Sequence, residues 1–344
     1  MQLYNKHSAK ERARIIDENS QERITLSFYK YFKLGNPSLF RDYLFVVWSK
    51  LDVLGRIYVA NEGINAQISV PTENYNKFNK SIKDISPLNG IRLNIAVQQY
   101  NKSFLKLTVK VRKKIVADGL DDKSFDVTKI GDHLNAKEFN KMLNDKNTVC
   151  IDMRNHYESE IGHFKDAVLP DVDTFRDSLD IIEKQMTKHK DDKNLLMYCT
   201  GGIRCEKASA YFKHKGFRNV YQLEGGIIEY IRQVKEENLE NNFLGKNFVF
   251  DNRRAEKISN DIIAACHQCG SPYDIHTNCA NDACHLLFIQ CDNCRDKMEN
   301  CCSYKCLEIK NMPYRLQKQL RSGQKNSNDI FKKWRTKNIT TFKK

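Results

Sequence analysis

The sequence predicts a multi-domain α/β protein with a ferredoxin-like βαββαβ domain, a parallel-sheet domain and a small Cys-rich module. Residues 24–116 alternate strand-like and helix-like patterns in the order βαββαβ, which favours a ferredoxin-like sandwich. From residue 133 strands alternate with helices, which implies a parallel sheet wound right-handed. Nine of the 12 cysteines then lie within residues 266–306.

The first domain is expected at 1–117. "ITLSFYKYFKL" has a β-rich composition, and two apolar runs around Asn61-Glu62-Gly63 predict a hairpin. Residues 91–99 and 104–114 return to a strand pattern. Two helices are expected between the strands. The face of the first would hold Leu39, Phe40, Tyr43, Leu44, Val47 and Leu51; the second would start from a capping Thr72, with Tyr75, Phe78, Ile82 and Ile85 on its apolar face.

The second domain is expected at 133–240, after a polar, acidic linker at 118–132. Asn135 and Glu138 form a capping-box pattern at its first helix. "TVCIDMR", "LLMYC" and "VYQLEGG" predict buried strands, and "IIEYIRQV" predicts a helix. A Cys-rich module at 241–314 and a basic tail at 315–344 complete the predicted organisation.

Composition limits the classes of function. The chain has 344 residues, of which 40% are hydrophobic and 29% charged, as in soluble globular proteins. We find no apolar run of about 18 residues and no secretion signal, so we expect a cytoplasmic protein without a membrane partner. The net charge of +14 favours a nucleic-acid partner, with a solvated lysine-rich surface as the alternative. We see no sign of a nucleotide cofactor.

The stretch "YCTGGIRCEK" predicts a reactive cysteine. A strand ends at Cys199 and a helix starts near Ile203, so the turn lies at the carboxyl edge of a parallel sheet, where sites form. Backbone N–H groups, the helix N-terminus and Arg204 would each favour a thiolate. The turn is completed by Thr200, Gly201 and Gly202. The alternative is a buried, unreactive cysteine, which does not call for two glycines and an arginine in one turn.

These residues resemble a known family. Cys199 and Arg204, with four residues between them, resemble the active loop of rhodanese domains, and "CIDMRNHYESEIGHFKDAVLP" and "VYQLEGGIIEY" resemble their flanking segments. The resemblance covers about residues 130–235 and implies that Asp152 and Arg154 brace the sheet and loop, while Glu158 and His163 anchor structure. His163 as a general base is an alternative. Related phosphatases have a longer loop, which disfavours phosphatase activity. Cys205 replaces a frequent small hydroxyl residue and would be a packed residue or a resolving thiol.

The whole chain resembles the bacterial tRNA uridine hydroxylases of the rhodanese superfamily. The resemblance rests on "GRIYVANEGINAQIS", "MYCTGGIRCEKASAYFKHKGF" and "NCANDACHLLFIQCDNC" and spans nearly all of 24–310. It implies oxygen-dependent formation of 5-hydroxyuridine at the tRNA wobble position, with molecular oxygen as co-substrate and Cys199 as the active residue. Chemistry alone would favour sulfur transfer through a Cys199 persulfide. A non-catalytic RNA-binding scaffold is a further alternative.

The cysteines of the module have the spacing of metal ligands. Two CxxC pairs lie 21 residues apart, close to the interval of zinc ribbons. A second site would combine Cys279, Cys284, Cys306 and either Cys301 or Cys302, giving a cross-braced module. We expect structural zinc, with an iron–sulfur cluster, simple thiols or disulfides as alternatives. The candidate ligands are Cys266, Cys269, Cys279, Cys284, Cys291, Cys294, Cys301, Cys302 and Cys306, with His267, His276 and His285 as substitutes.

The tail holds ten Lys or Arg residues and one acid, Asp329. Cations there would contact tRNA phosphates, and Trp334 would stack on a base. A solvated, disordered tail is the alternative. The candidate cations are Lys318, Arg321, Lys325, Lys332, Lys333 and Arg335.

Overall fold

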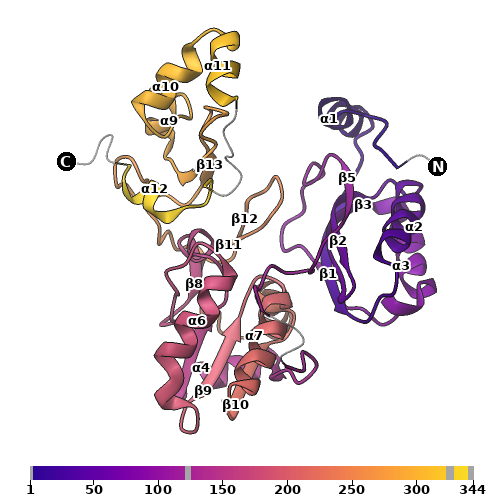
Figure 1. Ribbon diagram of the computed structural model, residues 1–344, viewed down its shortest axis with the longest axis vertical. Helices are drawn as coiled ribbons and strands as arrows, with labels where there is room; N and C mark the ends of the chain where they lie inside the picture. Colours follow the sequence, from indigo (N-terminus) through magenta and orange to yellow (C-terminus); the bar gives the residue numbers. More distant parts are fainter. Residues whose placement is uncertain (1–2, 121–124, 323–328, 340–344) are drawn as a thin grey trace. The chain divides into compact units, whose positions relative to one another are not determined.

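The computed structural model describes residues 3–120, 125–322 and 329–339 (Figure 1). The chain divides into two compact units, and each is described by itself. Unit 1 comprises Met1–Val149, Lys188–Glu240 and Val249–Glu256; unit 2 comprises Cys150–Thr187, Asn241–Phe248 and Lys257–Lys344.

The N-terminal part of unit 1 is a ferredoxin-like sandwich, as predicted. Its strands have the order β4-β1-β3-β2-β5, in which β5 adds to the edge parallel to β2 and the other neighbours pair antiparallel. Helices α2 and α3 cover one face of the sheet (Figure 1). The elements are α1 (Ala9–Glu18), β1 (Arg23–Tyr31), α2 (Pro37–Ser49), β2 (Leu54–Ala60), β3 (Gly63–Pro71), α3 (Tyr75–Asp84), β4 (Asn94–Ile95) and β5 (Leu107–Val111).

The hairpin between β2 and β3 lies where the sequence places it. Ala60 pairs with Gly63, so Asn61 and Glu62 form a two-residue connection. Gly63 has φ of +140°, and a Cβ there would lie 2.0 Å from the carbonyl oxygen of Lys30. Glycine is therefore required at this position.

The predicted apolar face of α2 is partly wrong. Leu39 is 68% exposed and Tyr43 is 48% exposed, whereas Leu44, Phe45 and Trp48 are buried. The helix turns its bulky aromatic side chains toward the sheet, because aromatic groups remove the most apolar area from water. The Trp48 ring packs edge-on against Phe28, with ring centroids 6.1 Å apart.

The predicted cap of α3 is also wrong. Thr72 opens a short 3-10 turn, Thr72–Asn74, and α3 starts at Tyr75 without a side-chain cap. The predicted apolar face is correct for Phe78, Ile82 and Ile85, which are buried against the sheet.

The parallel sheet has the order β6-β10-β9-β7. β10 pairs parallel with both β6 and β9. The capping box of Asn135 and Glu138 is present at the start of α4. The elements are β6 (Asp132–Leu134), α4 (Ala136–Leu143), β7 (Thr148–Asp152), β9 (Asn194–Tyr198), α7 (Ile203–His214), β10 (Asn219–Leu223) and α8 (Gly226–Glu237).

Unit 2 carries a small antiparallel pair, β8 with β11, and the cysteine-rich module. In the part of the chain that the structure describes, no helix has the length and apolar character needed to cross a membrane. The remaining elements are α5 (His156–Ser159), β8 (Gly162–Phe164), α6 (Phe175–Met186), β11 (Phe243–Phe248), β12 (Ala255–Lys257), β13 (His276–Asn278), β14 (Leu287–Ile289), α9 (Asp292–Met298), α10 (Tyr304–Asn311), α11 (Tyr314–Arg321) and α12 (Lys333–Lys337).

Candidate functional site: a cysteine loop beside a cavity

The cysteine turn connects β9 to α7 within unit 1. Gly202 is the N-terminal cap of α7 with φ of +99°, and its N–H donates to Cys199 Sγ over 3.1 Å. A Cβ on Gly202 would lie 2.7 Å from the hydroxyl of Tyr29. A glycine is therefore needed both for the backbone conformation and for the close approach of Tyr29.

In a second glycine pair, Gly225 and Gly226, the latter packs against the backbone of the cysteine turn. Gly226, which follows β10, has φ of +68°, and a Cβ there would lie 2.5 Å from the Cys199 carbonyl oxygen. The next N–H, of Ile227, donates to that oxygen over 3.0 Å. The motif "LEGG" therefore holds the cysteine turn by close backbone packing.

The surroundings of Cys199 favour its thiolate. Burial raises the pKa of Cys199, but a hydrogen bond from the Cys205 thiol, the charge of Arg204 and the backbone N–H groups of both residues lower it to about 6. Burial and the neighbouring Cys199 raise the pKa of Cys205 well above its usual range. The pair therefore holds an anionic sulfur on Cys199 and a protonated one on Cys205.

Cys199 is only 1% exposed, and Cys205 is fully buried. Cys205 is thus packed at the start of the helix, and in addition its thiol contributes to the lowered pKa of Cys199. Arg204 is also buried, and its guanidinium lies 3.5 Å from the hydroxyl of Thr200.

A cavity of about 310 Å³ lies next to this turn, and all of its lining residues belong to unit 1. Its size falls within the range of about 300–1,000 Å³ that is usual for small-molecule sites. Strands of the ferredoxin-like sheet and the cysteine turn both contribute to it. The lining residues are Tyr29, Lys30, Tyr31, Gly90, Ile91, Arg92, Asn94, His133, Gly201, Glu206, Glu224 and Gly225.

Several polar groups of this cavity were missed by sequence reasoning. Glu206 accepts hydrogen bonds from the Tyr29 hydroxyl at 3.1 Å and pairs with His133 Nε2 at 3.0 Å. The hydrogen bond to Glu206 raises the pKa of His133, whereas burial, followed by the charge of Glu206, raises the pKa of Tyr29 well above its usual range. Glu206 directly follows Cys205 in the first turn of α7, so its position in the sequence could have predicted a place near the cysteine turn. No neighbouring motif in the sequence indicates that Tyr29 of β1 contributes to the cavity.

The residues expected to brace the sheet pair with each other in unit 2. Arg154 contacts Asp152 at 2.6 Å and donates to the Gly162 carbonyl over 2.6 Å, and both side chains are fully buried. Their support of the cysteine loop stays a prediction. Glu158 completes a capping box with Asn155, and His163 Nδ1 lies 2.9 Å from the Ser159 carbonyl oxygen, an arrangement suited to a structural histidine.

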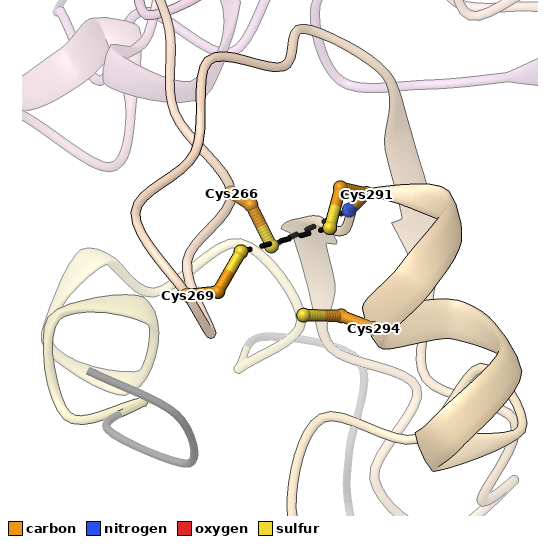
Figure 2. A group of neighbouring side chains, drawn as sticks. All are labelled: Cys266, Cys269, Cys291 and Cys294. Atoms are coloured by element: carbon orange, nitrogen blue, oxygen red, sulfur yellow. Dashed lines mark hydrogen bonds between the residues drawn. The ribbon is translucent and has the colours of Figure 1, made fainter. Parts of the chain in front are cut away.

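The cysteine-rich module brings eight cysteines into two groups of four. In each group all four sulfur atoms lie within 4.8 Å of one another. The first group is Cys266, Cys269, Cys291 and Cys294, whose sulfur atoms point toward one another from two loops and the start of α9 (Figure 2). The Cys269 and Cys291 sulfurs are 3.6 Å apart. Four thiolates about 2.3 Å from one ion would have sulfurs at similar separations, so both groups fit a tetrahedral metal.

Of the adjacent Cys301 and Cys302, the second group includes Cys302. It contains Cys279, Cys284, Cys302 and Cys306, whereas Cys301 belongs to neither group among the described residues. The two groups alternate along the chain, which is the cross-braced arrangement that spacing suggested. The three candidate histidines also lie outside both groups; His267 instead pairs with Glu160 at 2.7 Å.

Residues 329–339 of the basic tail pack onto the rest of unit 2, whereas helix α11, Tyr314–Arg321, has no buried residue. Phe331 stacks on Tyr157 with ring centroids 4.7 Å apart, and Ile339 is buried against the second cysteine group. Several cations of the tail have local partners. Lys332 lies 3.2 Å from Asp173, and Arg335 donates to Cys284 Sγ over 2.9 Å. Lys333 and Arg321 pair with Asp171 and Asp282. Trp334 is 60% exposed, and Lys325 lies outside the described residues.

Comparison with known proteins first defines the class. Residues 23–115 match the UPF0176 acylphosphatase like domain, 135–233 the rhodanese-like domain, and 244–307 the rhodanase C-terminal domain. The chain is a rhodanese-domain protein with an acylphosphatase-like N-terminal domain.

Curated relatives then define the family. The tRNA uridine(34) hydroxylase of Cronobacter sakazakii is 52% identical over 342 residues, which is 99% of this chain and 97% of the relative. Those of Yersinia pestis and Leptospira interrogans are 53% and 50% identical, each over 96% of this chain and over 93% and 89% of their own lengths. The chain belongs to the tRNA uridine(34) hydroxylase family.

Proposed function

We propose that this protein hydroxylates uridine 34 of tRNA to 5-hydroxyuridine, with dioxygen as co-substrate and Cys199 as the reacting side chain. The observation that carries the proposal is a cysteine with a pKa of about 6 in a turn that borders a cavity large enough for a nucleobase. The names of the relatives supply the substrate, and the charge of +14 suits a polyanionic one.

The proposed chemistry begins with addition of the Cys199 thiolate to C6 of the uracil ring. A C6–S bond forms, and the electron pair of the C5–C6 double bond moves to C5 and the adjacent carbonyl. C5 then takes one oxygen atom from dioxygen, while two electrons and two protons from an external reductant convert the other atom to water. Loss of the C5 proton and departure of the thiolate restore the double bond. Arg204 and the N–H groups of the turn stabilise the departing sulfur anion.

Sulfur transfer through a persulfide on Cys199 would use the same turn, so the identity of the product is the decisive measurement. We expect label from ¹⁸O-dioxygen in the modified uridine, no product under anaerobic conditions, and no need for thiosulfate. Cys199→Ser should abolish product formation while the circular dichroism and melting temperature stay close to wild type. A product that forms without oxygen and carries sulfur from the donor would overturn the hydroxylase proposal.

We also propose that the two cysteine groups hold structural zinc. Their all-sulfur composition and tetrahedral spacing suit zinc, which would supply folding energy to a module with few apolar residues. Elemental analysis of the purified protein distinguishes zinc from iron; iron with inorganic sulfide would indicate a cluster instead.

A further inference from the structure

Asn94 has an unusual position for an asparagine. It lies on β4, paired with Ser27 of β1, and is only 4% exposed. It lines the cavity beside the cysteine turn, and its Nδ2 donates to the Gly201 carbonyl oxygen over 3.4 Å. A Cβ on Gly201 would lie 3.7 Å from the same Nδ2, so the asparagine amide and the turn are in van der Waals contact.

The amide oxygen of Asn94 is left without a partner. Within the described residues, Oδ1 is buried and accepts no hydrogen bond. Turning the amide over would place this oxygen against the Gly201 carbonyl oxygen, so the contact with Gly201 fixes the orientation. Buried polar atoms are nearly always hydrogen-bonded, so an unpartnered oxygen on a residue that lines a cavity calls for an explanation, and a bound ligand would supply one.

Other polar side chains of the cavity already have partners. Tyr29 and His133 both contact Glu206, and Arg92 pairs with Glu224. Asn94 therefore differs from these neighbours in having a buried acceptor without a partner among the described residues.

We propose that Asn94 reads the Watson–Crick edge of the target uracil, accepting the N3–H on Oδ1 and donating its second Nδ2 hydrogen to a neighbouring carbonyl oxygen. The inference rests on the proposed function for the identity of the base. Unpaired bases of RNA loops are commonly read on this edge. Cytosine presents a lone pair at N3, which the fixed Oδ1 would repel. N3 also lies opposite C6 in the ring, so this contact leaves the reacting C5–C6 edge free.

The test pairs one substrate atom with one side chain. Anticodon stem-loop RNAs carrying uridine, 3-methyluridine or cytidine at position 34 are titrated against wild type and Asn94→Ala. We expect wild type to bind the uridine RNA about 10- to 100-fold more tightly than the other two. Asn94→Ala removes the acceptor and makes room for the methyl group, so its preference should fall below about 3-fold. Equal preference in wild type and variant, or none in wild type, would overturn the proposal.

Two controls separate the possible causes. Asn65→Ala removes a comparable side chain–backbone hydrogen bond from the same sheet, to the Ile115 carbonyl, and should keep the wild-type preference. If Asn94→Ala does not fold, Asn94→Ser supplies the second variant, with melting temperature as the check. Hydroxylation is assayed separately: normal base preference without labelled product refutes the hydroxylase, whereas labelled product with an unchanged preference in Asn94→Ala refutes only the role of Asn94.

Discussion

At the residue scale, the protonated thiol of Cys205 stabilises the thiolate of Cys199, and burial of both side chains strengthens this interaction. Cys205 donates to the thiolate, so the hydroxyl residue frequent at this position in rhodanese domains is replaced by a weaker but still functional donor. We therefore predict that Cys205 helps to set the pKa of Cys199, in addition to filling space at the start of α7.

The pH dependence of activity should reveal this role. Because the thiolate is the reactive form and the pKa of Cys199 is lowered to about 6, kcat/KM should rise with pH through about 6 and then level off. Cys205→Ala removes a donor to the anion, so the midpoint should move to higher pH by about one to two units. Cys205→Ser keeps a donor and serves as the matched control. Superimposable profiles for all three proteins would show that Cys205 does not act on Cys199.

At the scale of elements, helix α7 carries a buried cation toward the hairpin of the ferredoxin-like sheet. Lys207 is 1% exposed; its Nζ lies 2.7 Å from Glu62 and 3.5 Å from Asp118, and 5.3 Å from the centre of the Tyr31 ring. Asp118 was expected to begin a polar linker, yet it is 1% exposed. This network joins α7 to the β2–β3 connection within unit 1.

Breaking this network should lower stability strongly. Lys207→Ala removes the cation that contacts both Glu62 and Asp118. We expect a loss of about 3 kcal/mol in the free energy of unfolding. This is the low end for a buried pair, because Lys114 still contacts Asp118. Lys213→Ala, on the same helix, removes a hydrogen bond from Nζ to the Ile130 carbonyl; it is the control and should cost under about 1 kcal/mol. Urea unfolding measures both. A similar small loss for the two variants would mean that the network does not hold α7.

How much the sequence could predict depended on whether the signal was local. The turn at Asn61 and Glu62 and the capping box at Asn135 involve neighbouring residues, and the structure has both. The face of α2 was misassigned because apolar residues occupy nearly every position from 39 to 48, so periodicity alone could not orient the helix. Tyr29 reaches Glu206 from 177 positions away, a contact that no short motif encodes. The choice between adjacent Cys301 and Cys302 likewise needed their positions in space.

At the scale of the whole molecule, metal content follows from the two cysteine groups. We expect two zinc ions per chain and a lower melting temperature after chelation. Cys302→Ala should reduce zinc to about one ion, whereas its neighbour Cys301→Ala should retain both. Metal-free protein of unchanged stability would contradict the zinc proposal.

The docked tail changes what its cations are expected to do. Each cation that neutralises an RNA phosphate adds to the salt dependence of binding, by about 0.7 to 0.9 in logarithmic slope. Because Lys332, Lys333 and Arg335 have partners within unit 2, truncation after residue 328 should leave the slope of tRNA binding nearly unchanged and lower the melting temperature instead. A slope reduced by two or more, with unchanged melting, would place the phosphate contacts on the tail.

The alternation of the two cysteine groups along the chain affects how the module is assembled. Cys279 and Cys284 lie between the two halves of the first group, within the 21 residues that separate Cys269 from Cys291. An ion bound by the first group would close that segment into a loop and remove much of the chain entropy opposing the second group. The first ion would therefore raise the affinity for the second, so that partly loaded protein would be scarce during biosynthesis even when zinc is limiting.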